Sequence, residues 1–246
     1  MKERLGKNIG LIALVFLYAY MVLKIFFSGK STFYIHPDFT LAVLVCGLFF
    51  ALLAFLLVVS LGTKKSWGAD SHSVMTNYGK LLLVVLPVAL FLIFPAKPLS
   101  SQAFLARSID STQNQVFSRR VVQTPEFIIN TENRSLIDWI RLFSQSNDYA
   151  SFTSLKARLT GFVLKDESLP DGYFTLARFV ISCCAADARP IGLIVKYDSN
   201  LYNLSPDQWL EVRGEFAVEE INGQNKPVLI LKDAKTIEIP DNPYIS

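Results

Sequence analysis

The feature that most constrains this chain is a run of 23 residues, Phe39 to Leu61, without a charged side chain. A helix rises about 1.5 Å per residue, so the run is long enough to cross the roughly 30 Å apolar core of a bilayer. Hydrophobic residues make up 51% of the 246-residue chain, and nearly all of the excess over a soluble protein falls before residue 96. The sequence therefore predicts a membrane region followed by a soluble domain.

Two further apolar runs extend the predicted membrane region. Ile9 to Phe27 is 19 residues long and contains one charge, Lys24, near its end. Leu81 to Phe94 is only 14 residues long, but its flanking residues lengthen it to a marginal span, and Pro87 is tolerated because intramembrane helices carry proline readily. We predict three transmembrane α-helices, at about 9–27, 39–61 and 78–95, within a membrane region of residues 1–96.

The first run has an alternative interpretation as a cleaved signal peptide, because it follows the basic start "MKERLGK". A signal core is shorter, at roughly 7–15 apolar residues, and is followed by a small-x-small cleavage site that is missing after Phe27. The run is therefore predicted to be a retained anchor.

The distribution of Lys and Arg predicts the orientation of the membrane region. Short cytoplasmic loops carry an excess of these residues. Six of them fall on the side of the N-terminus and four on the other side: Lys2, Arg4, Lys7, Lys64, Lys65 and Lys80 against Lys24, Lys30, Lys97 and Arg107. The bias places the N-terminus inside the cell and everything after Pro95 outside, provided that the third span exists; with two spans the domain would lie in the cytoplasm.

The chain after the membrane region divides into a tether and a folded domain. Residues 97–130 are rich in Ser, Gln and Arg and have too few apolar residues for a core, which predicts a tether. In residues 131–246, Leu136 to Phe143 has near-helical apolar spacing after Thr131 or Asn133 as a cap. The tether is therefore expected to lead into one amphipathic helix.

Beyond Ser151 the apolar period changes to two, which is typical of strands. Five strands are predicted in "LKARLTGFVLKD", "GYFTLARFVISCC", "IGLIVKYD", "WLEVRGEFAVEE" and "PVLILKDAKTIEI". Their number and spacing resemble an OB-fold, a five-stranded Greek-key barrel, with another small β-barrel as the alternative. The net charge of +3 and the lack of a Lys/Arg cluster argue against a nucleic-acid partner.

Two adjacent cysteines, Cys183 and Cys184, with Asp187 three residues on, form the candidate metal site. Adjacent strand residues point to opposite faces, so both thiols serve one zinc or other thiophilic ion only where the strand ends or bulges. The following "AADARP" is a turn-like exit that permits this. Two other interpretations stay open: a redox or disulfide role, and burial as small apolar side chains.

Other polar residues are expected to have structural roles. Arg178 and Asp187 are expected to pair at one end of a strand hairpin, and Cys46 is expected to pack within the second span. His36 and Pro37 lie at the predicted membrane boundary, where amphipathic side chains anchor a helix start; a coordinating or proton-handling role for His36 is the alternative. No nucleophile elbow, P-loop or zinc-protease motif is present in the sequence, so no enzyme is expected.

Several segments of the sequence, taken in order, resemble those of a known family. Three hydrophobic spans, then "RFVISCCAADARPIGLIV", "WLEVRGEF" and the ending "IPDNPYI" resemble the YcgQ-type family of bacterial membrane proteins, which are regarded as permease subunits. Some members have a histidine-rich loop between spans two and three, but this chain has only His72 there. Some also have histidine at the position of Cys183, while Cys184 and Asp187 match, which favours a metal over redox chemistry.

The resemblance implies an accessory subunit of a multi-spanning permease, anchored in the lipid bilayer of the cell membrane. Its extracytoplasmic OB-like domain would dock on the permease or present the substrate, such as a metal ion, to it. The alternative is a stand-alone extracytoplasmic protein whose binding depends on a metal or a thiol. A cytoplasmic nucleic-acid-binding module would require the reverse topology.

Overall fold

The computed structural model describes residues 2–62, 86, 89–90, 93–94, 96–108, 131–146 and 148–245. The chain forms two compact units, Met1–Lys97 and Pro98–Ser246. The boundary between them falls beside the predicted end of the membrane region.

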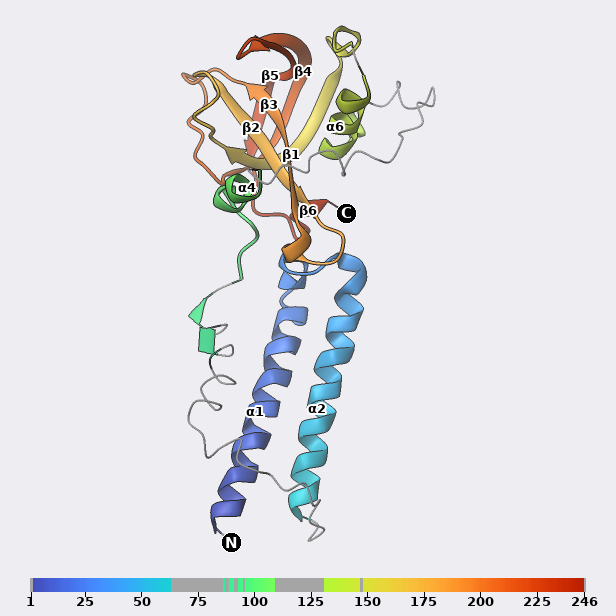
Figure 1. The fold of residues 1–246 in the computed structure, drawn as a ribbon, viewed down its shortest axis with the longest axis vertical. Helices are drawn as coiled ribbons and strands as arrows, with labels where there is room; N and C mark the ends of the chain where they lie inside the picture. The colour runs from blue at the N-terminus through green and yellow to red at the C-terminus, as the bar shows by residue number, and fades with distance from the viewer. Residues whose placement is uncertain are drawn as a thin grey trace. The chain divides into compact units, whose positions relative to one another are not determined.

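The first unit contains two long helices, α1 (Lys2–Phe27) and α2 (Thr40–Gly62). They lie side by side as a hairpin (Figure 1), joined by the short 3₁₀ turns η1 (Lys30–Phe33) and η2 (Pro37–Phe39). Helices α1 and α2 therefore confirm that the first two predicted apolar runs are helical.

Small residues allow α1 and α2 to approach each other closely. Ala19 of α1 and Ala54 of α2 are buried. A Cβ atom on Gly47 would lie only 2.9 Å from Cδ2 of Leu23, so a larger residue here would require the Leu23 side chain to move. Interfaces between intramembrane helices are commonly built in this way.

One helix among the described residues is long and apolar enough to cross a membrane, with its candidate span at Pro37–Leu56. The apolar stretch Ala13–Phe27 of α1 is shorter than a full span. The predicted third span at 78–95 lies largely outside the described residues. The structure thus shows one helix of the required kind where the sequence predicted three.

The second unit is mainly β, as predicted. All five predicted strands are present: β1 (Lys156–Leu164), β2 (Tyr173–Val180), β3 (Arg189–Lys196), β4 (Trp209–Ile221) and β5 (Gln224–Thr236). Strand β1 pairs antiparallel with both β2 and β4, β2 pairs with β3, and β4 pairs with β5. A parallel β3–β5 pair completes the circle, so the strands close into a barrel in the order β1-β2-β3-β5-β4 (Figure 1).

Two features of the sheet differ from the prediction. Strand β2 ends at Val180, whereas the sequence predicted a strand that continues through the cysteine pair. A short sixth strand, β6 (Tyr244–Ile245), pairs parallel with the end of β2. Because β6 is only two residues long, it has no periodicity that a sequence pattern would reveal.

Helix α6 (Leu136–Gln145) confirms the predicted amphipathic helix and packs on the main barrel core. Trp139 is fully buried, with its ring centroid 4.5 Å from that of Phe216 on β4. The predicted caps were wrong. Ser135 is the N-cap residue, and its backbone N–H donates to the Asp138 carboxylate at 3.1 Å, while Thr131 to Asn133 form a separate 3₁₀ turn, η4.

Part of the predicted tether is a helix, α4 (Ser101–Ser108), that packs on the barrel. The backbone N–H of Ser101 donates to the Asp207 carboxylate at 2.6 Å, and Phe104 meets Phe179 edge-on with centroids 6.0 Å apart. The rest of the predicted tether, residues 109–130, lies outside the described residues.

Candidate functional site

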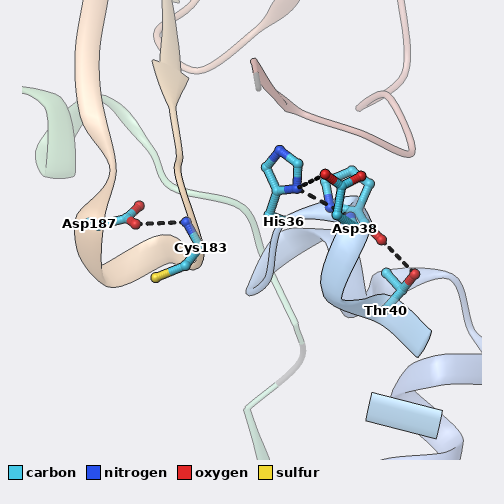
Figure 2. A network of polar contacts seen from close by, with 6 residues as sticks. His36, Asp38, Thr40, Cys183 and Asp187 are labelled. Carbon is cyan, nitrogen blue, oxygen red and sulfur yellow. Dashed lines mark hydrogen bonds and ion pairs between the residues drawn. The ribbon is translucent and has the colours of Figure 1, made fainter. Parts of the chain in front are cut away.

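The cysteine pair lies in a tight turn between β2 and β3. Cys184 precedes the single 3₁₀ turn η6 (Ala185–Asp187). The Asp187 carboxylate accepts hydrogen bonds from the backbone N–H groups of Ser182, at 3.0 Å, and Cys183, at 2.7 Å. Figure 2 shows this carboxylate directed back at the Cys183 nitrogen. Asp187 therefore closes the turn on which the thiols stand.

Because β2 ends at Val180, Cys183 and Cys184 lie in the turn and their thiols are near each other. Their Sγ atoms are 3.6 Å apart, and both cysteines are free thiols. Cys183 is exposed and Cys184 is half-buried, so neither is a fully buried core residue. The third cysteine, Cys46, lies on α2 in the first unit.

The Asp187 carboxylate also affects the protonation of Cys183. A hydrogen bond between the Cys183 thiol and Asp187, followed by one with Cys184, raises the pKa of Cys183 to about 11. Partial burial works to raise the pKa of Asp187, but hydrogen bonds from the Cys183 thiol and nearby backbone N–H groups outweigh it and lower that pKa. Cys183 is therefore a neutral thiol at pH 7, whereas metal binding and nucleophilic attack require the thiolate.

The structure brings the three predicted metal ligands into one turn but gives their groups other partners. Among the described residues there is no cluster of three or more His, Cys, Asp or Glu side chains arranged to hold a metal. The Asp187 carboxylate is engaged by backbone N–H groups. The metal assignment of Cys183, Cys184 and Asp187 stays a prediction, and the contacts support a turn-shaping role for Asp187.

An arginine from another element, Arg107, also contacts this turn. Arg107 of α4 donates from Nη2 to the carbonyl of Ala185 at 3.1 Å and from Nη1 to that of Ala188 at 3.2 Å. Its guanidinium also lies over the Phe179 ring, 5.9 Å from the centroid. The turn is therefore held both through its aspartate and through its carbonyl groups.

The expected pairing of Arg178 with Asp187 was wrong. Arg178 donates from Nε to the carbonyl of Pro243 at 3.1 Å, and from Nη2 to those of Asn242 at 2.9 Å and Tyr244 at 3.3 Å. Burial lowers the pKa of Arg178 to about 10. Arg178 thus holds the C-terminal segment, and it is separated from these partners by more than 60 residues, so no local sequence signal reveals the contact.

Tyr244, in the ending "DNPYI", connects two parts of the second unit. Its side chain is buried, and its hydroxyl accepts a hydrogen bond from the backbone N–H of Leu99 at 3.0 Å. Its backbone pairs with Phe179 of β2 in the parallel β2–β6 ladder. The last residues of the chain therefore link the barrel wall to the segment that precedes α4.

His36 caps a turn in the first unit. Its Nδ1 accepts a hydrogen bond from the backbone N–H of Asp38 at 3.2 Å, and the Thr40 hydroxyl donates to the carbonyl of Pro37 at 2.7 Å (Figure 2). These contacts shape the start of α2. They support the expected structural role of His36 at this helix start.

Together these features define a class of chain: an apolar helical hairpin joined to a β-barrel domain whose C-terminal segment is locked by an arginine. The family model for the DUF1980 C-terminal domain matches residues 104–246, which include the whole barrel. The chain belongs to this family.

One curated relative matches the chain more broadly. It is the UPF0703 protein YcgQ of Bacillus subtilis (strain 168), which is 23% identical over 151 residues. The match covers 61% of this chain and 51% of that protein, so the chain spans about half the length of the relative. The resemblance to the YcgQ-type family is thereby confirmed.

Proposed function

We propose that this protein is a membrane-anchored accessory subunit of a permease. Its helical region anchors it in the cell membrane beside a multi-spanning partner, and its barrel domain docks on that partner or presents a substrate to it. The protein acts by binding and not by catalysis. The observation that carries the proposal is the exposed apolar surface of α2.

That surface extends along most of the helix. Its exposed large apolar side chains are Leu41, Val45, Leu48, Phe49, Leu52, Leu53, Phe55, Leu56, Val58 and Val59. Contiguous apolar surface of this extent is costly in water and marks contact with a membrane or another protein. Lipid tails and the helices of a polytopic partner both satisfy it, and the small-residue interface with α1 leaves this face available to them.

The barrel suits a binding role. We infer an OB-fold from the closed order β1-β2-β3-β5-β4 with its parallel β3–β5 pair. OB-folds are binding modules with varied ligands, so the fold alone does not choose the partner. The excess of Lys and Arg on the N-terminal side supports an extracytoplasmic barrel, given a third span at 78–95.

The alternative, a stand-alone protein that depends on a metal or a thiol, has less support. The exposed Cys183 is held as a neutral thiol by its neighbours, and Asp187 is engaged by the backbone of its own turn. A metal bound there would have to displace both sets of contacts and release the thiol proton.

Photocrosslinking in native membranes tests the proposal. A photoreactive amino acid replaces Leu48, which is 54% exposed on α2, or Ala54, which is 2% exposed against α1. We expect the Leu48 position to give an adduct with one polytopic membrane protein, identified by mass spectrometry, and the Ala54 position to give little or none. Adducts only with lipid or with a second copy of this chain would overturn the permease role while leaving the membrane anchor intact.

A further inference from the structure

A polar cavity of about 250 Å³ lies on the second unit, between the η4–α6 segment and the barrel wall. Three arginines line it, one each from the η4–α6 segment, β1 and β2. The side chains that matter for its chemistry are Arg134, Arg158, Arg178, Thr160, Glu132 and Glu211. No sequence motif joins these residues, because they are spread over 80 positions.

Arg178 is the best-positioned of the three arginines. Its Nε and Nη2 groups are held by carbonyl oxygens of the C-terminal segment, which fixes the plane of the guanidinium. None of the described residues accepts a hydrogen bond from Nη1, and Arg178 lines the cavity. Its partners are all neutral, so a partly buried positive charge is left without a counter-charge, and two N–H donors remain for a ligand.

The other two arginines add charge to the same space. Arg158 is exposed on the outer face of β1, two residues before Thr160, whose hydroxyl is a further donor. The guanidinium of Arg134 lies over the buried Trp139 ring, 5.0 Å from its centroid, which restricts where that charge can lie. Guanidinium groups recognise planar carboxylates and phosphate oxygens through paired N–H donors.

The two carboxylates at the cavity do not neutralise this charge. Glu211 accepts a hydrogen bond from Nη2 of Arg213 at 3.2 Å, and Arg213 does not line the cavity. Glu132 is exposed. Asp138 attracts the charge of Arg134, whereas Arg158 and Arg178 face one carboxylate that is already paired and one that is solvated.

We propose that this cavity binds a small oxyanion, the carboxylate or phosphate group of a small-molecule ligand, with Arg178 and Arg158 as its main donors. The volume suits one such group and a few attached atoms. The proposal does not depend on the permease role, because it rests on residues of the barrel domain alone. It gives the domain a ligand class that the cysteine turn does not provide.

Titration of the full-length protein in detergent micelles tests the proposal. Inorganic phosphate, pyrophosphate, acetate and citrate are titrated separately by isothermal calorimetry, with sodium chloride at matched ionic strength as the control. We expect saturable binding of the phosphates or of the carboxylates, and the series that binds tells the two sources apart. Tryptophan fluorescence follows the same titration, because Arg134 lies over the Trp139 ring and Arg178 over the Trp209 ring.

Two variants and one matched control connect the binding to the cavity. Arg158→Gln removes an exposed charge and is expected to weaken binding about tenfold, the usual loss for one charge-assisted hydrogen bond. Lys156→Gln removes the same charge from the same face of β1 outside the lining set and should leave the affinity within about twofold. Arg178→Lys keeps the charge but loses the planar fork and should weaken binding more than Arg158→Gln.

The proposal fails if none of the four anions binds saturably above the chloride control. It also fails if Lys156→Gln weakens binding as much as Arg158→Gln, because the effect would then be general surface charge. Should Arg178→Lys unfold the barrel, as judged by thermal denaturation, the comparison of Arg158 with Lys156 alone decides the outcome.

Discussion

Replacing Asp187 with Asn should make the Cys183 thiol more reactive. The Asp187 carboxylate is the main cause that raises the pKa of Cys183 from 9.0 to about 11. Asparagine has a similar shape, and its single side-chain oxygen keeps one of the two backbone hydrogen bonds that Asp187 accepts, while the negative charge is lost. A thiol with its pKa raised by a carboxylate ionises more readily once that carboxylate is removed.

The size of the effect follows from the thiolate fraction at pH 8. A thiol with a pKa of about 9 is ~10% ionised at that pH, and one with a pKa of about 11 is ~0.1% ionised. The full shift is therefore worth about 100-fold in the rate of alkylation, and the share due to Asp187 is expected to be at least about tenfold.

The assay is the rate of iodoacetamide labelling from pH 7 to 10 in a background that carries Cys46→Ser and Cys184→Ser. Asp166→Asn is the matched control, because Asp166 accepts a backbone hydrogen bond from Ser168 in a similar turn without a thiol beside it. Equal labelling rates with and without Asp187→Asn would refute the electrostatic account of this turn. A faster rate that Asp166→Asn reproduces would point to loosening of the domain instead.

Three further predictions concern the stability of the barrel domain, each measured by urea unfolding followed through tryptophan fluorescence in micelles. Tyr244→Phe removes the acceptor of the Leu99 N–H and should lower the free energy of unfolding by about 1–2 kcal/mol; an unchanged value would mean that the C-terminal link is not stabilising. Trp139→Ala empties the centre of the core and should cost about 3–5 kcal/mol or prevent folding; a cost below 1 kcal/mol would contradict the position of α6. The Glu219 carboxylate accepts hydrogen bonds from Lys196, at 2.6 Å, and from the Tyr173 hydroxyl. Partial burial acts to raise the pKa of Glu219, but these two hydrogen bonds lower it. Its stabilisation is therefore fully present above the ordinary pKa of 4.5 and is lost as the pH falls through the lowered value, so Glu219→Gln should cost up to ~1 kcal/mol at pH 7 and progressively less as the pH falls below 4.5. A cost that does not change over this range would rule out this ion pair as its cause.

The sequence predicted those elements whose physics is local. Helix α2 follows from an uncharged run of bilayer length, and β1 to β5 follow from alternation bounded by turn residues. Helix α6 was found in the same way, although its cap was placed too early, because several Ser, Thr and Asn residues precede it and any of them is a reasonable cap by type.

What the sequence did not predict depends on contacts between distant segments. The partners of Arg178 lie 64 to 66 residues away, in a stretch with no periodicity of its own. Asp187 illustrates a different difficulty, because a carboxylate near two thiols has the same sequence pattern whether it binds a metal or closes a turn. The one available signal was the spacing of four to five residues between Asp187 and the backbone N–H groups that donate to it, which suits a side-chain-capped turn.

The role proposed for the barrel domain depends on the side of the membrane on which it lies, and labelling of intact cells measures this directly. In a background without Cys46, Cys183 and Cys184, Ser199→Cys places a reactive thiol in the exposed turn between β3 and β4. A membrane-impermeant maleimide should label it on intact cells, while Lys2→Cys at the predicted cytoplasmic end should be labelled only after lysis. Labelling of Ser199→Cys only after lysis would contradict the account, because an accessory subunit that presents an extracytoplasmic substrate cannot have its binding domain in the cytoplasm.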